Sequence, residues 1–221
     1  MRTLRHALKR RQILRHSIDV RGAFEQWEES CVPSYVHSNL LAAYVSWKRL
    51  FVAADLTRQL VGRPARVLDF GSSVGELSHI LDYAGDYEFV EFDDASAEFL
   101  LAQNGRARRR ELSDAPLASY DAIFAIDSLE HNENYRELLG ELVGRLAPGG
   151  VLVLSGPTEN VLYRLGRKIA GFKGDYHVTT IYDIERETAV LLDQVAVRTV
   201  PFGIPLFRIT GWRRRPGSGA L

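Results

Sequence analysis

Short apolar runs alternate with segments of helical periodicity through the middle of the chain. The apolar runs, each a candidate strand, cover residues 66–70, 87–92, 107–112, 121–126 and 151–155. The helical patterns between them cover 74–84, 95–104 and 133–146. Strands that alternate with helices in this way pair into a parallel sheet with right-handed crossovers. The pattern therefore predicts an α/β fold with a doubly wound, mostly parallel sheet.

Three further segments flank this alternating region. A helical pattern at 39–61 precedes the first strand, with Asn39 as its candidate N-cap. Near the other end, apolar runs at 194–200 and 206–212 are joined by a turn that contains proline and glycine, which predicts an antiparallel pair. We expect residues 157–181, between these regions, to form a cap over the substrate.

The start of the chain is basic. Residues 1–21 contain seven Lys or Arg against the single acid Asp19, although the whole chain has a formal net charge of zero. Apolar residues recur there at loosely helical intervals, which indicates an amphipathic helix over 2–20. Two interpretations stay open: a solvated leader helix, or a helix that binds a membrane surface or an acidic partner. We divide the chain into a basic N-terminal extension, 1–38, and a domain, 39–215.

Composition narrows the class of protein. With 221 residues and 46% hydrophobic content, the chain is long enough for one well-buried domain. The single cysteine, Cys31, cannot form a disulfide within the chain, which is typical of a cytoplasmic protein. The sequence contains neither an apolar stretch long enough to span a bilayer nor a recognisable signal peptide, so any membrane contact would be peripheral. Zero net charge argues against nucleic acid as a partner, and the oligomeric state is not indicated.

The turn after the first strand is the sharpest chemical signal. Asp69 lies near the end of that strand, and Gly71, Ser72, Ser73 and Gly75 follow it. Glycine permits left-handed backbone angles and close approach of a ligand, and the next helix would present unpaired N–H groups. The Gly-x-x-x-Gly spacing differs from the Gly-x-Gly-x-x-Gly fingerprint of pyrophosphate binding, which argues against a nicotinamide or flavin cofactor.

Acidic residues follow the other strands at the same edge of the predicted sheet. Asp93 and Asp94 follow the second strand, Asp114 the third and Asp127 the fourth. Ligands of such sheets bind beyond the carboxyl ends of the strands, and an acid after the second strand can accept hydrogen bonds from a ribose. With the loop residues, these four are the candidate cofactor-binding residues.

Three longer segments carry a family resemblance. They are Val-Leu-Asp-Phe-Gly-Ser-Ser-Val-Gly (67–75), Tyr-Asp-Ala-Ile-Phe-Ala-Ile-Asp-Ser-Leu-Glu-His (120–131) and Leu-Ala-Pro-Gly-Gly-Val-Leu-Val-Leu-Ser-Gly-Pro-Thr (146–158). Together they resemble the class I S-adenosylmethionine-dependent methyltransferases, in the style of the group that includes the ubiquinone-biosynthesis O-methyltransferases. The resemblance covers about 60–213 and implies a seven-stranded sheet whose last pair is antiparallel.

The resemblance also implies a cofactor site. The loop from Gly71 to Gly75 would hold the methionine end of S-adenosylmethionine, with Asp69 supporting it and Ser73 in place of the family's usual middle glycine. Asp93 would bind the ribose. Asp114 would either face the adenine or serve only as a turn residue.

A second group of polar residues follows the fourth strand. If a helix opens there, Asp127, Glu130 and His131 share one face. The group resembles the Glu-x-x-Glu-His motif of metal-dependent small-RNA 2′-O-methyltransferases and ubiquinone O-methyltransferases, in which a further histidine completes a magnesium site. His177 lies in the matching region. Three interpretations stay open: these four residues hold Mg²⁺ that acidifies a substrate hydroxyl, His131 is a general base, or Glu130 and His131 only brace the loop.

The resulting prediction is an S-adenosylmethionine-dependent enzyme that methylates a hydroxyl of a small-molecule, glycan or lipid-linked acceptor. His131, Glu130 and His177 are its candidate catalytic residues. The alternatives are N-methylation, or an S-adenosylmethionine-binding partner protein without catalysis. The basic N-terminus and the basic face of the 157–181 cap together would contact an anionic or lipid-linked substrate near a membrane.

Overall fold

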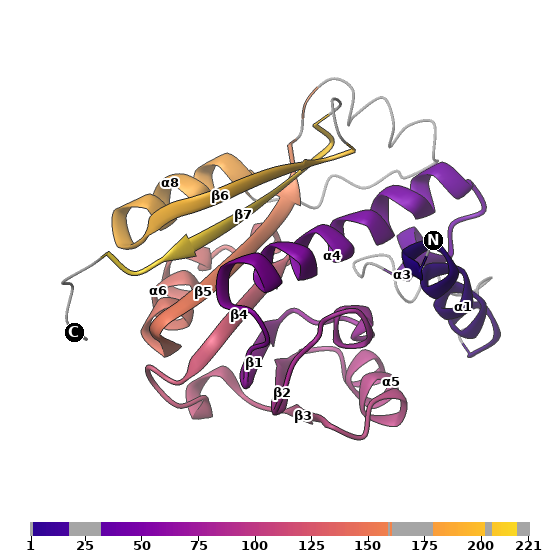
Figure 1. Cartoon of the computed structure of the whole chain (residues 1–221), viewed down its shortest axis with the longest axis horizontal. Helices are drawn as coiled ribbons and strands as arrows, with labels where there is room; N and C mark the ends of the chain where they lie inside the picture. Colours follow the sequence, from indigo (N-terminus) through magenta and orange to yellow (C-terminus); the bar gives the residue numbers. More distant parts are fainter. Residues whose placement is uncertain (1, 18–31, 159, 161–178, 202–204, 216–221) are drawn as a thin grey trace.

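The computed structural model describes residues 2–17, 32–158, 160, 179–201 and 205–215. Across these residues the chain forms a seven-stranded sheet of order β3-β2-β1-β4-β5-β7-β6 (Figure 1). Only the pairs that involve β7 are antiparallel. The strands are β1 (Arg66–Phe70), β2 (Asp86–Val90), β3 (Ala107–Arg109), β4 (Tyr120–Ile126), β5 (Leu146–Pro157), β6 (Asp193–Val200) and β7 (Phe207–Arg213). The predicted sheet and its antiparallel closing pair are confirmed.

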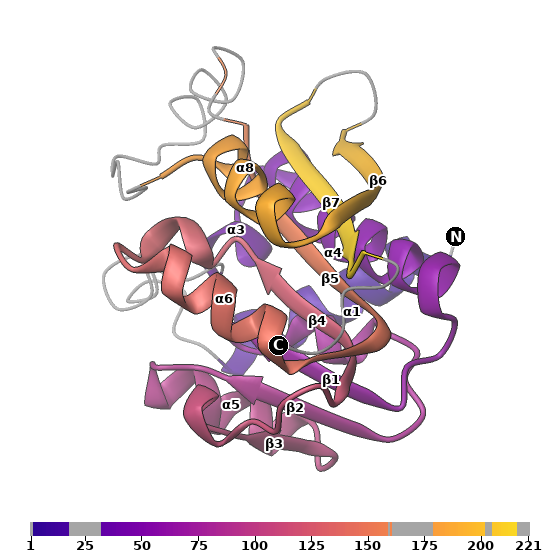
Figure 2. The same ribbon diagram turned by 90° about the vertical axis from the view of Figure 1, so that its left-hand side faces the viewer.

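Helices cover both faces of this sheet (Figures 1 and 2). On one face lie α1 (Arg2–Ser17), α3 (Val32–Val36), α4 (Leu40–Val61) and α5 (Asp94–Gln103), and on the other lie α6 (Tyr135–Arg145) and α8 (Ile181–Leu191). Each face has its own apolar core, and the central strands contribute to both. As predicted, Asn39 caps α4, because its side chain accepts a 2.9 Å hydrogen bond from the Leu41 amide.

The strand after the Pro-Gly-Gly turn differs from its predicted bounds. It was expected over 151–155, but β5 begins at Leu146 and passes through Pro148, Gly149 and Gly150. Gly149 has a φ of 80°, and the pairing with β4 shifts register at this point. The glycines therefore form an irregularity within the strand instead of ending the preceding helix.

Two predicted elements that come after the first strand in the chain are much shorter than expected. The predicted helix 74–84 is only the 3₁₀ helix η1 (Glu76–His79). The predicted strand 107–112 ends at Arg109 and is followed by the 3₁₀ helix η2 (Leu112–Asp114). The apolar side chains Leu77 and Leu81 of the first segment are nevertheless buried, which explains the helical periodicity.

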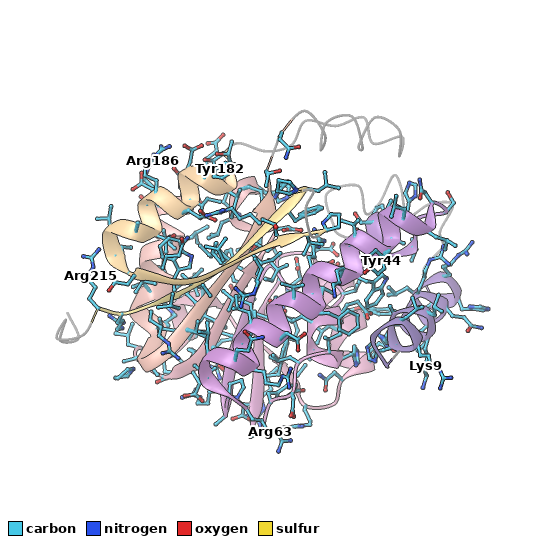
Figure 3. All side chains as sticks on the ribbon, turned by 45° about the horizontal axis from the view of Figure 1, so that its top comes forward. Lys9, Tyr44, Arg63, Tyr182, Arg186 and Arg215 are labelled. Carbon is cyan, nitrogen blue, oxygen red and sulfur yellow. The ribbon has the colours of Figure 1, made fainter. Side chains whose placement is uncertain are left out.

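The basic start of the chain is part of the fold. On α1, Leu14 is fully buried and Ala7 nearly so, and both belong to the same core as α4 and the sheet. Arg10 is only 7% exposed. The interpretation as a solvated leader helix is therefore wrong for residues 2–17. The outward face of α1 carries Leu8 and also Lys9, which is labelled in Figure 3.

No helix in the described part of the chain is long and apolar enough to cross a lipid bilayer.

Candidate active site

The turn after β1 adopts the left-handed backbone that its glycines predict. Gly71, Ser73 and Gly75 have φ angles of 70°, 50° and 74°. A Cβ on Gly71 would lie 2.4 Å from the Cβ of Ser128, and one on Gly75 would lie 2.2 Å from the Cγ of Leu100. Packing as well as backbone conformation therefore requires glycine at both positions. The register of the parallel strands brings this turn beside the carboxyl ends of β2 and β4.

A carboxylate that the sequence reasoning missed contacts this turn. Glu91 is the first residue after β2, and its Oε2 accepts a 2.6 Å hydrogen bond from the Ser73 amide. Its Oε1 accepts a 3.0 Å hydrogen bond from the amide of Asp93. Glu91 thus joins the glycine turn to the loop that begins α5. The strand was predicted to run to residue 92, and because it ends at Val90, its first following acid is Glu91.

Asp93, predicted to bind the ribose, and Asp94, predicted to bind the cofactor, both have other partners in the structure. Asp93 is the N-cap of α5, where its Oδ2 accepts a 2.8 Å hydrogen bond from the Ser96 amide. Asp94 Oδ1 accepts a 2.7 Å charged hydrogen bond from Arg109 at the protein surface.

An exposed aromatic residue directly follows Glu91 in the chain. Phe92 is 67% exposed, and its ring meets that of Phe70 in a T-shaped arrangement with centroids 6.3 Å apart. A large apolar side chain so exposed beside a polar turn is suited to contact a flat ligand. Asp114, the other residue predicted near an adenine, is exposed at the end of η2.

Asp69 lies under the turn in a buried setting. Its carboxylate is 2% exposed and accepts a short hydrogen bond from the hydroxyl of Tyr87. Burial raises the pKa of Asp69 to about 7; the Tyr87 hydrogen bond opposes this rise, and the nearby charge of Glu91 adds to it. Asp69 therefore changes its charge in the neutral range, directly below the candidate cofactor loop.

The residues after β4 do not form the single helical face that was expected. Asp127 lies outside any helix, with a φ of 50°, and the 3₁₀ helix η3 (Leu129–His131) begins two residues later. The Asp127 carboxylate forms a buried ion pair with Arg49 of α4 and accepts a 2.9 Å hydrogen bond from Ser155. Glu130 is 1% exposed, whereas His131 is exposed. The premise that placed these side chains on one face is therefore wrong.

The described residues give no support to a magnesium site. Nowhere in the described ranges do three or more His, Cys, Asp or Glu side chains come together in a way that could hold a metal ion. Asp127, the first expected ligand, is paired with the guanidinium of Arg49. His177 and most of the 157–181 cap lie outside the described residues.

Aromatic side chains surround Arg49 at the end of β4. The guanidinium lies 4.9 Å from the ring centroid of Phe207 and 5.8 Å from that of Tyr35. Trp47 is buried against Tyr35 with centroids 5.2 Å apart, and Tyr44 is 47% exposed on α4. Arg49 was missed because nothing in its own segment marks it; its role depends on Asp127, far along the chain.

Comparisons with known proteins agree with this architecture. A family model described as a methyltransferase domain matches residues 44–190, and the chain belongs to this family. The chain is thus a methyltransferase, and its fold is that of the class I S-adenosylmethionine-dependent enzymes. No curated protein matches the sequence.

Three solved structures illustrate the likeness in fold. Magnesium protoporphyrin IX methyltransferase (ChlM) from Synechocystis PCC 6803, with bound S-adenosylhomocysteine, has a TM-score of 0.65 and 15% identity over 90% of this chain and 100% of that one. The PH0226 protein from Pyrococcus horikoshii OT3 has a TM-score of 0.63 and 16% identity over 76% and 90%. N-methyltransferase NodS from Bradyrhizobium japonicum WM9, with S-adenosylhomocysteine, has a TM-score of 0.62 and 15% identity over 78% and 88%.

Proposed function

We propose that this chain binds S-adenosylmethionine at the Gly71–Gly75 turn and transfers its methyl group to a hydroxyl of a small-molecule acceptor. The observation that carries the cofactor assignment is the hydrogen bond from the Ser73 amide to Glu91, beside two glycines in left-handed conformation. Each carboxylate oxygen has more than one acceptor position, so Glu91 can hold the turn and also accept hydrogen bonds from ribose hydroxyls. Two proteins of similar fold contain S-adenosylhomocysteine.

The remaining contacts to the cofactor follow from this placement. Phe92 would pack against the adenine, since it is an exposed aromatic residue that directly follows Glu91 in the chain. Gly71, Ser72 and Gly75 would leave room for the methionine end of the cofactor. Asp93 and Asp94 would act indirectly, by fixing the start of α5.

The acceptor would bind beyond the end of β4. The bound cofactor supplies an electrophilic methyl group, so the protein must position the acceptor and take its proton. We assign the role of proton acceptor to His131, because imidazoles ordinarily titrate near neutral pH and His131 is the exposed member of the group after β4. As the hydroxyl proton passes to the imidazole, the acceptor oxygen would gain the methyl group, and the donor, whose methyl–sulfur bond breaks, would leave as S-adenosylhomocysteine. Glu130, buried beside it in the chain, would orient this loop.

The choice of oxygen as the methylated atom rests on the residues that follow β4, and not on the fold. Proteins of similar fold include the N-methyltransferase NodS, the CurJ carbon methyltransferase and the [4+2]-cyclase SpnF. These differ in the atom or the reaction, so the fold leaves the acceptor open. An acceptor with an apolar part is supported by Leu40, Leu41 and Tyr44, which are exposed at the start of α4.

A labelling experiment tests the proposal. The purified protein would be incubated with methyl-labelled S-adenosylmethionine and a protein-free extract of small molecules, and the labelled product would be isolated. We expect an O-methyl product, and we expect His131→Gln to slow its formation while leaving the affinity for S-adenosylhomocysteine within about twofold. A labelled N-methyl or C-methyl product would contradict the assignment of oxygen. Lack of binding to S-adenosylhomocysteine would contradict the whole proposal.

A further inference from the structure

The helix that usually follows a glycine turn of this kind is nearly absent from this chain. After the turn, η1 spans only Glu76–His79, and β2 starts at Asp86. A 3₁₀ helix this short cannot by itself bury the apolar residues between β1 and β2 or hold the Gly71–Gly75 turn in one conformation. The turn therefore depends on packing from elsewhere in the sequence.

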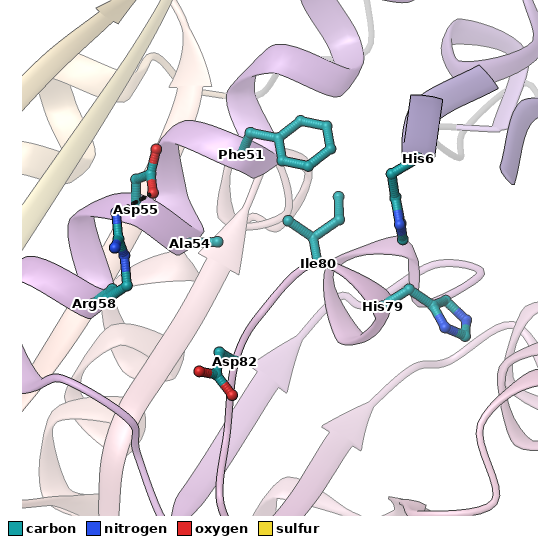
Figure 4. A pocket seen from close by; sticks show the side chains of 8 residues that line it. All are labelled: His6, Phe51, Ala54, Asp55, Arg58, His79, Ile80 and Asp82. Atoms are coloured by element: carbon teal, nitrogen blue, oxygen red, sulfur yellow. Dashed lines mark hydrogen bonds and ion pairs between the residues drawn. The ribbon is translucent and has the colours of Figure 1, made fainter. Parts of the chain in front are cut away.

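Part of that packing comes from α1. Ala7 and Leu14 belong to the same core as Val74 and Leu77, the apolar residues on either side of the end of the turn. A cavity of about 480 Å³ remains between α1, α4 and the segment after η1 (Figure 4). Figure 4 shows His6 of α1 and His79 of η1 at one end of this cavity and Asp55, Arg58 and Asp82 at the other. The N-terminal helix thus covers one side of a space that η1 leaves unfilled.

A buried bidentate ion pair joins α1 to the residue directly after the turn. Arg10 donates from Nε to Glu76 Oε2 at 2.9 Å and from Nη2 to Glu76 Oε1 at 2.7 Å. The side chains are 8% and 0% exposed. A third hydrogen bond, from Arg10 Nη1 to Gln103 Oε1 at 3.1 Å, reaches the last residue of α5. One guanidinium therefore links three elements, and arginine suits this role because its donors are fixed in one plane.

Glu76 is coupled to the turn through the backbone. Its neighbour Gly75 adopts the left-handed conformation that begins η1, and the Gly75 amide donates to the Ser72 carbonyl at 3.0 Å. The Gly75 carbonyl accepts hydrogen bonds from both the amide and the hydroxyl of Ser78, at 3.0 and 2.7 Å. Movement of the Glu76 side chain would therefore disturb a continuous set of hydrogen bonds that defines the end of the turn.

We propose that Arg10 is a positioning residue for the methyl donor: by holding Glu76, it sets the Gly71–Gly75 turn in its binding conformation before the cofactor arrives. The proposal rests on the proposed function, in which this turn binds S-adenosylmethionine. It also gives the basic N-terminus a defined role inside the enzyme. A turn that is already ordered does not have to be ordered when the cofactor binds, so no binding free energy is lost in ordering it.

The test is the affinity for S-adenosylhomocysteine, measured by isothermal titration calorimetry at a temperature at which each variant is folded. Arg10→Met keeps much of the aliphatic volume and removes the charged donors. We expect it to weaken binding roughly tenfold or more, since hydrogen bonds to charged groups are among the stronger ones. Arg5→Met, on the exposed face of the same helix, is the matched control and should bind as the wild type does.

A second variant separates positioning from a general loss of stability. Glu76→Gln removes the same ion pair from the other side and should weaken binding to a similar extent. The double variant should bind S-adenosylhomocysteine about as well as the single variant of lower affinity, because both changes break the same interaction. Amide hydrogen exchange over residues 72–78 should be faster in folded, ligand-free Arg10→Met than in Arg5→Met.

The outcomes are distinguishable. If the wild type binds S-adenosylhomocysteine and folded Arg10→Met and Glu76→Gln bind it within twofold of the wild type, the role of Arg10 is refuted and the proposed function stands. If Arg10→Met does not fold, Glu76→Gln decides alone. If the wild type does not bind S-adenosylhomocysteine, both proposals fall.

Discussion

Replacing Asp69 by Asn should change how the stability of this protein depends on pH. Burial raises the pKa of Asp69 from its ordinary value of 3.8 to about 7. Between these values the folded chain keeps a proton that the unfolded chain has released, so the free energy of unfolding falls as pH rises from about 4 to about 7. A pKa difference of this size corresponds to a loss on the order of 4 kcal/mol over that range.

Urea unfolding of the wild type and of Asp69→Asn at several pH values measures this effect. The quantity to compare is the difference in free energy of unfolding between the two proteins, because other groups titrate in the same pH range and contribute to both. His79, for example, has its pKa lowered to about 4 by burial and by the nearby charge of Arg10, and its effect on stability has the opposite sign. We expect the wild type to lose several kcal/mol relative to Asp69→Asn between pH 4.5 and 7.5. A difference that stays flat, or that grows in favour of the wild type, would refute the reasoning.

A second change tests the cause of the shift. The Tyr87 hydroxyl donates to Asp69 and thereby stabilises the carboxylate. Tyr87→Phe removes this donor, so the pKa of Asp69 should rise further and the fall in stability should extend to higher pH. A shift of the transition to lower pH would contradict the assigned role of the hydroxyl.

Two further predictions concern packing at the candidate site, and both are measured by urea unfolding. Gly75→Ala places a Cβ against Leu100 in a left-handed backbone conformation and should lower the free energy of unfolding by roughly 3 kcal/mol or more. The control is Gly140→Ala in α6, where the added Cβ meets no atom and the change should be neutral or stabilising. Equal effects of the two substitutions would contradict the packing argument. Arg49→Ala leaves the buried Asp127 carboxylate without its ion pair and should lower the free energy of unfolding by about 3–5 kcal/mol. Adding Asp127→Asn should recover much of this loss, whereas purely additive effects would show that the pair is not coupled.

The sheet could be predicted because its signal lies in local sequence. Strand β4 is apolar and buried at every position except Asp121, and the alternation of such runs with helical patterns is typical of parallel sheets. The extent of the elements beside the turn could not be predicted in this way. The segment after Gly75 has buried apolar residues at helical spacing, yet part of its packing comes from α1, and that contact involves residues far apart in the sequence.

The candidate site shows the same division between local and tertiary signals. Gly71 and Gly75 were recognisable because left-handed backbone angles favour glycine. Glu91 was missed because the predicted strand ended two residues too late, and a search for the first acid after the buried run would have found it. The pairing of Asp127 with Arg49 has no local signal, since the two residues meet only when α4 packs across the end of β4.

The binding of S-adenosylhomocysteine to Glu91→Gln tests the central claim most directly. Glutamine keeps the size of the side chain but removes the charge that accepts hydrogen bonds from the Ser73 amide and, in our account, from the ribose. Calorimetric titration should show affinity reduced roughly tenfold to a hundredfold relative to the wild type. Asp93→Asn, which keeps the capacity to cap α5, should leave the affinity within about twofold. Unchanged affinity in Glu91→Gln together with a large loss in Asp93→Asn would contradict the account.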